Sequence, residues 1–305
     1  MYAMDTAGTQ PPVVAGVDGS DSALEAVRWA AREAQRRAAP LRLVHAYSVP
    51  ALPPCETAAV VAAFNQQGSA WLDAARAVAE EAAPGSSPSC VTLAGSGAER
   101  LVAESQDAEL VVVGSRGLGG FAEQLVGSVA VALATYGACP VVVVRSATEH
   151  VPVPTRGPVV VGVDGSAAGD GPLAFAFDTA ARLGAQLVAV HTWSDLTQYG
   201  AWNSLGGATS YEERYESKRA ELTGWLAGWR EKYPDVGVTE IVLRDRPVRG
   251  LLDTAAHAGG VGAQLLVIGS RGPAPATGMT LGSTSWSLLH YAECPLAVVR
   301  VGLGW

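Results

Sequence analysis

The sequence predicts an α/β protein of two tandem domains, each a doubly wound, five-stranded parallel sheet with strand order 3-2-1-4-5. Three observations lead to this fold class. Strongly apolar runs alternate with helix-like segments, which is typical of parallel strands covered on both faces. Almost every feature in the first half of the 305 residues recurs in the second half. Between the halves, residues 146–158 carry three prolines and no apolar period, which indicates a linker between domains 1–147 and 158–305.

The first domain begins with a β-branched strand, residues 12–20, that ends in an Asp-Gly turn. A helix over residues 22–38 follows, because Ser22 and Glu25 have capping-box spacing and apolar residues recur at helical period. The remaining elements are predicted, in order, as strand 41–47, a loop ending near 57, helix 58–82, strand 89–95, helix 98–106, strand 109–113, helix 127–136 and strand 140–145.

The second domain repeats these strands at residues 158–166, 185–193 and 293–301. His191 and Gly269 are nine residues further apart than His45 and Gly114, so a longer flap is expected within residues 194–215. The last strand of each half should lie at a sheet edge, where open backbone groups favour pairing with the other half as an intrachain pseudo-dimer. A further homodimer is expected because the tandem halves present similar surfaces twice.

A glycine pattern stands at the end of the fourth strand in both halves. Its two copies share gaps of two and nine residues, and they comprise Gly114, Gly117 and Gly127-Ser128, then Gly269, Gly272 and Gly282-Ser283. Glycines after a buried strand let the backbone approach a ligand closely, and the helix start that follows offers free N–H groups to an anion. The pattern therefore predicts a phosphate cradle, present twice.

The predicted strand order places this cradle opposite the turn that follows the first strand. Ligands of doubly wound sheets bind beyond the carboxyl ends of the strands where the winding reverses, which here lies between strands one and four. Asp18 ends the first strand and Gly114 ends the fourth. A carboxylate and a phosphate cradle are therefore expected to share one crevice in each domain.

Composition argues against several classes of partner and enzyme. The formal net charge is −8 and only two lysines occur, which argues against a nucleic-acid-binding surface. Because neither Lys218 nor Lys232 lies near a glycine loop, the sequence excludes a P-loop kinase or ATPase. Any anion contact is expected from backbone N–H groups, hydroxyls or arginines such as Arg116 and Arg271.

The glycine pattern is accompanied in both halves by VDGS after the first strand, His in the second strand and Cys-Pro before the fifth. In these motifs the chain resembles the universal stress protein family, specifically its ATP-binding tandem form. The resemblance covers both halves. It implies that Asp18 and Asp164 bind adenine or ribose beside Gly16 and Gly162, and that the backbones of Ala46 and Thr192 contact adenine. It also implies phosphate contacts, in the first half, from Gly114, Ser115, Arg116, Gly117, Leu118, Gly119, Gly120, Gly127, Ser128 and Val129, and in the second, from Gly269, Ser270, Arg271, Gly272, Gly282, Ser283 and Thr284.

The second copy departs from the first at three positions. Pro273 and Pro275 replace Leu118 and Gly120, which removes two N–H donors and predicts weaker binding there. Asp195 has no acidic counterpart in the first half and is a candidate contact to the ribose of the second site.

Sequence reasoning favours a binding protein, a nucleotide-dependent sensor or regulator with an unidentified protein partner, over an enzyme. No paired carboxylates and no Ser-His-Asp constellation stand out as general acid, base or nucleophile. Slow ATP hydrolysis stays open, since Mg²⁺ near Ser128 could orient water without a dedicated side chain. A flavodoxin-like flavin carrier is the other alternative, although Ser20 and Ser22 are better explained as helix caps.

The remaining expectations concern location and packing. Residues 1–10 lack a secretion signal and window 129–144 is too short to span a bilayer, so a cytoplasmic protein without a membrane span is expected. The cysteines are interpreted as buried, reduced thiols. His45 and His191 are interpreted as core histidines, and the tryptophans of the second half as helix packing or a docking patch.

Overall fold

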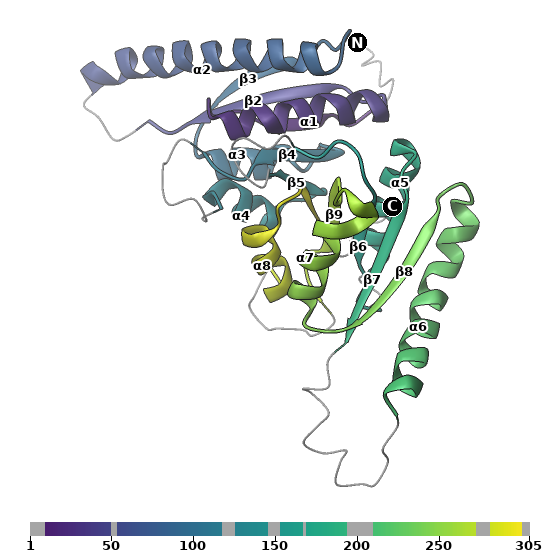
Figure 1. Cartoon of the computed structure of the whole chain (residues 1–305). Coiled ribbons are helices and arrows are strands. Elements are labelled where there is room, and N and C mark those ends of the chain that lie inside the picture. The colour runs from purple at the N-terminus through teal and green to yellow at the C-terminus, as the bar shows by residue number, and fades with distance from the viewer. Residues whose placement is uncertain are drawn as a thin grey trace, which may run out of the picture. The chain divides into compact units, whose positions relative to one another are not determined.

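The structure is a computed structural model that describes residues 10–49, 54–117, 126–145, 153–166, 169–193, 210–272 and 281–300. The chain divides into two compact units, unit 1 (Met1–Val144) and unit 2 (Arg145–Trp305). In each unit, helices cover a sheet of parallel strands (Figure 1). The α/β class predicted from the alternating apolar runs is confirmed in both units.

Unit 1 alternates strands and helices in the predicted order. Helix α2 begins at Pro54, earlier than the residue 58 expected from the sequence, because proline is well tolerated in the first turn of a helix. The elements are β1 (Val13–Gly16), α1 (Asp21–Arg37), β2 (Leu41–Tyr47), α2 (Pro54–Ala82), β3 (Ser89–Ala94), α3 (Gly97–Glu104), β4 (Leu110–Gly114), α4 (Ser128–Tyr136) and β5 (Val141–Val144).

Unit 2 repeats this order. Helix α6 starts at a capping box, in which the Ser210 hydroxyl accepts the N–H of Glu213 and the Glu213 carboxylate accepts the N–H of Ser210. Most of the predicted longer flap, residues 194–209, lies outside the described residues. The elements are β6 (Val159–Gly162), α5 (Asp170–Leu183), β7 (Leu187–Trp193), α6 (Tyr211–Lys232), β8 (Val238–Arg244), α7 (Pro247–His257), the 3₁₀ turn η4 (Ala258–Gly260), β9 (Leu265–Gly269), α8 (Ser283–Tyr291) and β10 (Leu296–Val299).

The strand order within each unit confirms the predicted 3-2-1-4-5 arrangement. Unit 1 runs β3-β2-β1-β4-β5 and unit 2 runs β8-β7-β6-β9-β10, with parallel pairing between neighbours. Val13 of β1 lies between Leu41 of β2 and Leu110 of β4. The winding therefore reverses between β1 and β4, and between β6 and β9, where a ligand site is expected.

The central strands form the core of each unit. Every residue of β1, β5 and β10 is buried, which explains why these strands read as continuous apolar runs. Alanines of α1, including Ala26, Ala30 and Ala31, are buried against this sheet, where their small side chains let the helix approach closely. In unit 2, Phe175 and Phe177 of α5 fill the corresponding layer and are 1% and 0% exposed.

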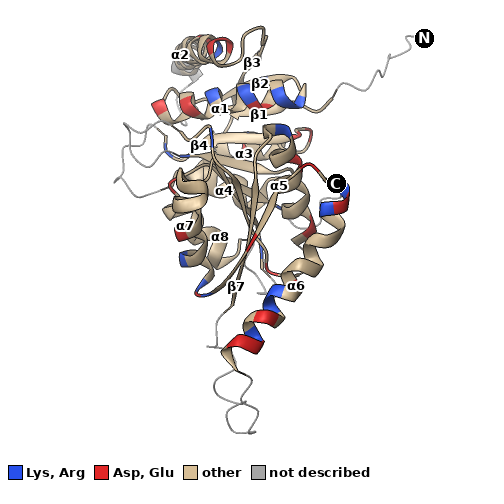
Figure 2. Ribbon diagram, turned by 45° about the vertical axis from the view of Figure 1, so that its right-hand side comes forward, with Lys and Arg blue, Asp and Glu red and all other residues tan. Residues whose placement is uncertain are grey.

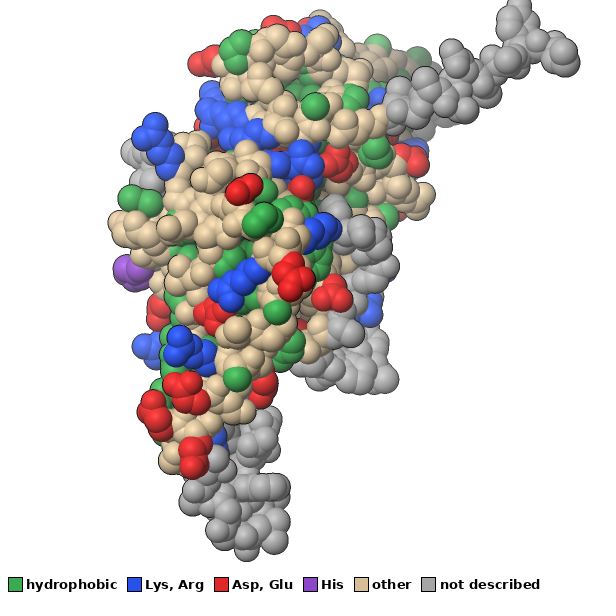
Figure 3. Space-filling model, turned by 90° about the vertical axis from the view of Figure 1, so that its right-hand side faces the viewer, with side chains coloured by type: hydrophobic (Ala, Val, Ile, Leu, Met, Phe, Trp, Pro, Cys, Tyr) green, Lys and Arg blue, Asp and Glu red, His purple; other side chains and the backbone are tan. Residues whose placement is uncertain are grey.

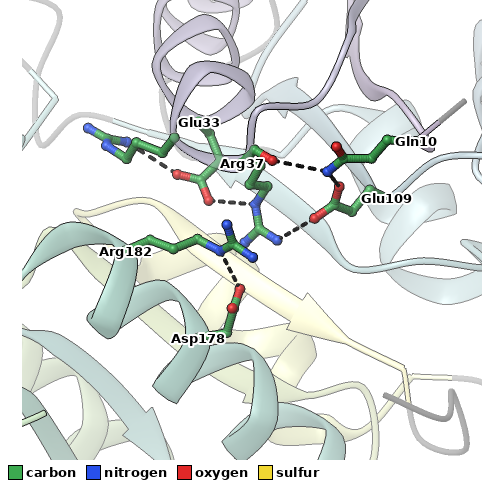
Figure 4. A network of polar contacts seen from close by, with 7 residues as sticks. Gln10, Glu33, Arg37, Glu109, Asp178 and Arg182 are labelled. Carbon is green, nitrogen blue, oxygen red and sulfur yellow. Dashed lines mark hydrogen bonds and ion pairs between the residues drawn. The ribbon is translucent and has the colours of Figure 1, made fainter. Parts of the chain in front are cut away.

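A buried ion-pair network closes the end of α1 in unit 1 (Figure 4). Arg37 Nε lies 2.7 Å from Glu33 Oε1, and another guanidinium nitrogen of Arg37 lies 2.8 Å from Glu109 Oε1. Glu33 and Arg37 are 1% and 4% exposed. Gln10 donates both to the Arg37 carbonyl and to Glu109. The network joins the end of α1 to the residue that precedes β4.

The outer surface of unit 2 carries charges of both signs along α6 (Figure 2). Lys218 pairs with Glu221 at 2.8 Å, and Arg230 with Glu240 of β8 at 2.6 Å. Acidic side chains gather at the start of this helix, as the space-filling view also shows (Figure 3). Across the part of the chain that the structure describes, no helix is both long and apolar enough to cross a membrane.

Candidate functional site

The turn that follows β1 fixes the carboxylate of Asp18. Its Oδ1 accepts the backbone N–H of Ser20 at 3.0 Å and the Ser20 hydroxyl at 2.6 Å. The same hydroxyl accepts the N–H of Ala23 at 3.2 Å and so caps α1. Because Oδ1 is held by two donors, the orientation of the carboxylate is set and Oδ2 points away from the turn.

Unit 2 repeats the turn with one difference. Asp164 Oδ1 accepts the N–H and the hydroxyl of Ser166, at 2.9 and 2.7 Å. Helix α5 starts only at Asp170, with Gly169 as its N-cap and no side-chain cap. Asp164 is therefore oriented as Asp18 is, but the Ser166 hydroxyl does not cap the helix; instead the N–H of Gly169 donates to the Ser166 carbonyl at 2.8 Å, and the Asp164 side chain is more exposed than that of Asp18.

The loop that follows β4 lies directly against the Asp18 carboxylate. A β-carbon on Gly117 would lie 2.5 Å from Asp18 Oδ2, which leaves room for glycine alone unless the carboxylate moves. In unit 2, a β-carbon on Gly272 would lie 3.7 Å from Asp164 Oδ2, an ordinary contact. The carboxylate and the glycine loop therefore lie side by side in both units, more tightly in unit 1.

The N-terminus of helix α4 lies beside the same glycine loop. Its N-cap is Gly127, with no side-chain cap, so the first N–H groups of the helix, including those of Ser128 and Val129, have no partner within it. The N–H of Gly127 donates to the Ser115 carbonyl at 2.8 Å and holds the helix start beside the loop. A β-carbon on Gly127 would lie 3.9 Å from the nitrogen of Gly117. The positive end of the helix dipole thus faces the glycine loop.

Helix α8 has the corresponding position in unit 2. Its N-cap, Gly282, also lacks a side-chain cap, and its N–H donates to the Ser270 carbonyl at 2.8 Å. Ser283 and Thr284 form the first turn. The buried Ser285 hydroxyl donates to the Gly269 carbonyl at 2.8 Å, a bond that Ala130 cannot make in unit 1. This bond ties the start of α8 to the end of β9.

Several predicted site residues serve the scaffold instead of offering free groups to a ligand. Ser115 and Ser270 are buried, and their N–H groups donate to the carbonyls of Val144 and Val299 at 3.1 and 2.8 Å. Neither N–H is therefore free for a phosphate. The N–H of Arg116 donates to the Ser22 hydroxyl at 3.4 Å.

The glycines that end strands β1, β4, β6 and β9 are packing positions. A β-carbon on Gly114 would lie 2.7 Å from the carbonyl oxygen of Ser22, so α1 can approach β4 only because this residue is glycine. Gly16 packs against a leucine of α3 and Gly162 against the corresponding leucine of α7. Gly269 is less tightly packed than Gly114, with Arg271 O at 3.2 Å as its nearest neighbour.

The residues expected beside adenine lie at the carboxyl ends of β2 and β7. Ala46 is half-buried and follows His45, whose Nδ1 lies 2.8 Å from the Val17 carbonyl. Thr192 is half-buried and its methyl faces Gly250 of α7. Leu118, Gly119, Gly120 and Asp195 lie outside the described residues, and Arg271 is exposed at the end of the described loop.

Sequence reasoning missed one member of the unit 1 site, Trp71 of α2. Its indole packs against Gly19, and Trp225 of α6 packs against Gly165 in unit 2. The signal available in the sequence was a tryptophan in the second helix of each half, Trp71 in α2 and Trp225 with Trp229 in α6. The sequence interpretation covered only the tryptophans of the second half, as helix packing or a docking patch.

The two buried cysteines are not activated thiols. Burial raises the pKa of the Cys139 and Cys294 thiols to about 12, so both are neutral at physiological pH. Cys90, Cys139 and Cys294 are free thiols; Cys139 and Cys294 are buried as the sequence predicts, whereas Cys90 is only half-buried. Among the described residues, no cluster of three His, Cys, Asp or Glu side chains could hold a metal ion. The site as described can bind hydroxyls through a carboxylate oxygen and an anion through a helix start.

Comparisons with known proteins agree on one family for both units. A sequence model of the Universal stress protein family matches residues 11–145 and again residues 155–300. Universal stress protein Rv2623 of Mycobacterium tuberculosis is 37% identical over 311 residues, covering 98% of this chain and 100% of that protein. Universal stress protein Mb2028c of Mycobacterium bovis is 38% identical over 299 residues, covering 95% of this chain and 97% of that protein.

The fold has a solved counterpart. The crystal structure of a universal stress protein from Archaeoglobus fulgidus aligns with a TM-score of 0.72 at 18% sequence identity. The alignment covers 96% of this chain and 99% of that chain. At this identity, the likeness concerns the fold alone.

Proposed function

The chain belongs to the universal stress protein family, in its tandem two-domain form, and from this we propose that it binds ATP and acts as a nucleotide-dependent sensor or regulator. One observation carries the proposal. The oriented carboxylate of Asp18 lies against the backbone of Gly117, beside the uncapped start of α4. A carboxylate suits ribose hydroxyls and a free helix start suits phosphates, so the two ends of a nucleotide have complementary partners.

The residues present fit a nucleotide at both ends. Asp18 Oδ1 is occupied by Ser20, which leaves Oδ2 to accept a hydrogen bond from a ribose hydroxyl. The N–H groups of Ser128 and Val129 can donate to phosphate oxygens because nothing within α4 accepts them. Unit 2 offers the same groups through Asp164, Ser283 and Thr284, which supports a second site.

We propose that Mg²⁺ accompanies the nucleotide. Mg²⁺ in nucleotide sites is held largely by phosphates and water, with few protein carboxylates. The described residues, which include no cluster of three potential metal ligands, are compatible with this arrangement. When bound, the ion would supply charge neutralisation for the phosphates.

A sensor needs differential affinity between two conformations or assemblies, and it needs no catalytic side chain. At the described part of each site, Oδ1 of Asp18 or Asp164 accepts two hydrogen bonds from a serine, which orients the carboxylate for binding a ligand.

Calorimetric titration with Mg²⁺-ATP tests the proposal, and we expect up to two bound nucleotides per chain. Mass spectrometry of small molecules released from denatured protein should identify an adenine nucleotide. Release of a flavin, or no binding at saturating Mg²⁺-ATP, would contradict the proposal.

The two glycine loops should respond differently to one added methyl. In Gly117→Ala the new methyl would meet Asp18 Oδ2 and displace the carboxylate from its serine donors, whereas in Gly272→Ala it would make only an ordinary contact. We expect the first variant to weaken its site by about tenfold more than the second, because a displaced charge-assisted bond costs about 1.5–3 kcal/mol. Calorimetry in Asp164→Asn and Asp18→Asn backgrounds measures each site alone. Equal losses in the two variants would show that Asp18 is not constrained by Gly117.

We also propose that the chain forms a homodimer, since tandem units present related surfaces twice. Sedimentation at tens of micromolar protein, with and without Mg²⁺-ATP, should show a species of twice the chain mass of 31.3 kDa. A monomer under both conditions would contradict the homodimer and leave the ATP sites unaffected.

A further inference from the structure

In unit 1, the indole of Trp71 covers the turn that carries Asp18. Gly19, the next residue, has a φ of +86°, and a β-carbon on it would lie 2.3 Å from Trp71 Cε2. Glycine is required here both for the positive φ and for the close approach of the ring. Because Trp71 belongs to α2, a side chain from the second helix of the unit lies directly against the proposed nucleotide site.

His45 holds the same turn from its other end. Its Nδ1 lies 2.8 Å from the carbonyl oxygen of Val17, the residue that precedes Asp18. The rings of His45 and Trp71 meet edge to face with centroids 5.1 Å apart. Gly68, one turn earlier in α2, allows this approach, since a β-carbon there would lie 2.5 Å from His45 Cδ2. Asp18 is thus bracketed by a histidine and a tryptophan that contact each other.

Unit 2 contains the same arrangement. Gly165 has a φ of +74°, and a β-carbon on it would lie 2.1 Å from Trp225 Cζ2. His191 Nδ1 lies 2.8 Å from the Val163 carbonyl, and the His191 and Trp225 rings meet edge to face at 5.2 Å. The Gly-Val-Asp-Gly-Ser turn and the strand histidine are the same in both halves, and the contact with a tryptophan of the second helix recurs with them.

Core packing does not account for these tryptophans. Leu72, Ala75 and Ala79 of α2 and Leu222 and Leu226 of α6 are buried and provide the contact of each helix with its sheet. Trp71 and Trp225 are only half-buried. Their distinctive contacts are with the glycine that follows Asp18 or Asp164 and with the histidine that holds the preceding carbonyl.

We propose that Trp71 and Trp225 are positioning residues that hold the aspartate turn in its ligand-binding shape and couple each site to α2 or α6. The inference rests on the ATP-binding function proposed above. A turn held from both sides loses little conformational entropy when the ligand arrives, which strengthens binding. By the same contact, a change in the turn on binding displaces the indole and its helix, which gives a partner protein a surface that reports occupancy.

The test uses the full-length chain in an Asp164→Asn background, so that calorimetry reports the unit 1 site. We expect Trp71→Ala to weaken Mg²⁺-ATP binding by about tenfold or more, and Trp71→Phe to restore most of the affinity because a flat ring again covers Gly19. The control is Trp286→Ala, which makes the same truncation at a 48% exposed position of α8 and should leave the unit 1 affinity unchanged.

Indole fluorescence gives a readout that mere stabilisation of the fold would not change. Mg²⁺-ATP should alter the emission of the background protein, and Trp71→Phe should remove most of that change while still binding. Failure of the background protein and the unaltered chain to bind ATP would refute the proposed function. Binding by Trp71→Ala as tight as in the background would overturn the positioning role alone. Should Trp71→Ala not fold, an undiminished fluorescence response in Trp71→Phe would overturn it equally.

Discussion

Arg37→Met is expected to lower the free energy of unfolding of unit 1 by about 3 kcal/mol, because it leaves the buried Glu33 carboxylate with Arg36, whose side chain is 31% exposed, in place of a buried ion pair. Glu33 is 1% exposed, and its Oε1 lies 2.7 Å from Arg37 Nε. The same guanidinium also pairs with Glu109, so its loss leaves two acids close together at the end of α1. Methionine keeps much of the side-chain length, which limits the packing change.

Calorimetry and hydrogen exchange together should measure this loss. A destabilisation of 1 kcal/mol lowers the unfolding midpoint by roughly 2–4 °C in domains of this size, so a fall of about 10 °C is expected for unit 1. Peptides of β1 and β4 should lose exchange protection, while peptides of unit 2 serve as the internal reference.

Two further variants separate charge burial from packing. Arg42→Met removes a pair with Glu104 whose side chains are 33% and 20% exposed, and it should cost about 1 kcal/mol or less. Adding Glu33→Leu to Arg37→Met removes the buried carboxylate, which then has only the partly exposed Arg36 as a partner, and should recover part of the lost stability. If Arg42→Met cost as much as Arg37→Met, burial of the charges would not be the cause.

The fold could be predicted from the sequence because its signals are local and repeated. Continuous apolar strands, an Asp-Gly turn and a shared glycine spacing recur in both halves, and the switch-point rule then brings Asp18 to Gly117. The Arg37 network could not be found this way. Glu33 and Arg37 are spaced like an exposed pair on a helix, and only the docking of α1 beside Glu109 shows that they are buried.

Within the site, the sequence indicated which segments meet but not which atoms stay free. Ser115 and Ser270 lie inside the glycine pattern, yet β-sheet pairing uses their N–H groups. Gly114 matches the pattern because α1 packs against it, which spacing alone cannot distinguish from a ligand contact. The contact of Trp71 with Gly19 depends on how α2 docks on the sheet, and the apolar period of an alanine-rich helix does not specify that angle.

Asp18→Asn combined with Asp164→Asn is expected to weaken ATP binding strongly at both sites while the fold is kept. An asparagine can still use its oxygen to accept the N–H and hydroxyl of Ser20 or Ser166, so each turn is preserved. Its amide nitrogen then replaces Oδ2 and can only donate. A ribose hydroxyl that donated to the carboxylate finds no acceptor, which costs about 1.5–3 kcal/mol, roughly 10- to 100-fold in affinity at each site.

Binding and turnover measured on the same variants separate a sensor from an enzyme. In a sensor, the double variant binds ATP much more weakly, and the conformational or oligomeric response to ATP weakens with it. An enzyme with a catalytic aspartate would keep binding and lose turnover. We expect the unaltered chain to hydrolyse ATP far more slowly than about 1 s⁻¹, the lower range of ordinary enzymes. Turnover at that rate or faster, together with a double variant that binds ATP but does not hydrolyse it, would require a catalytic carboxylate and refute the sensor.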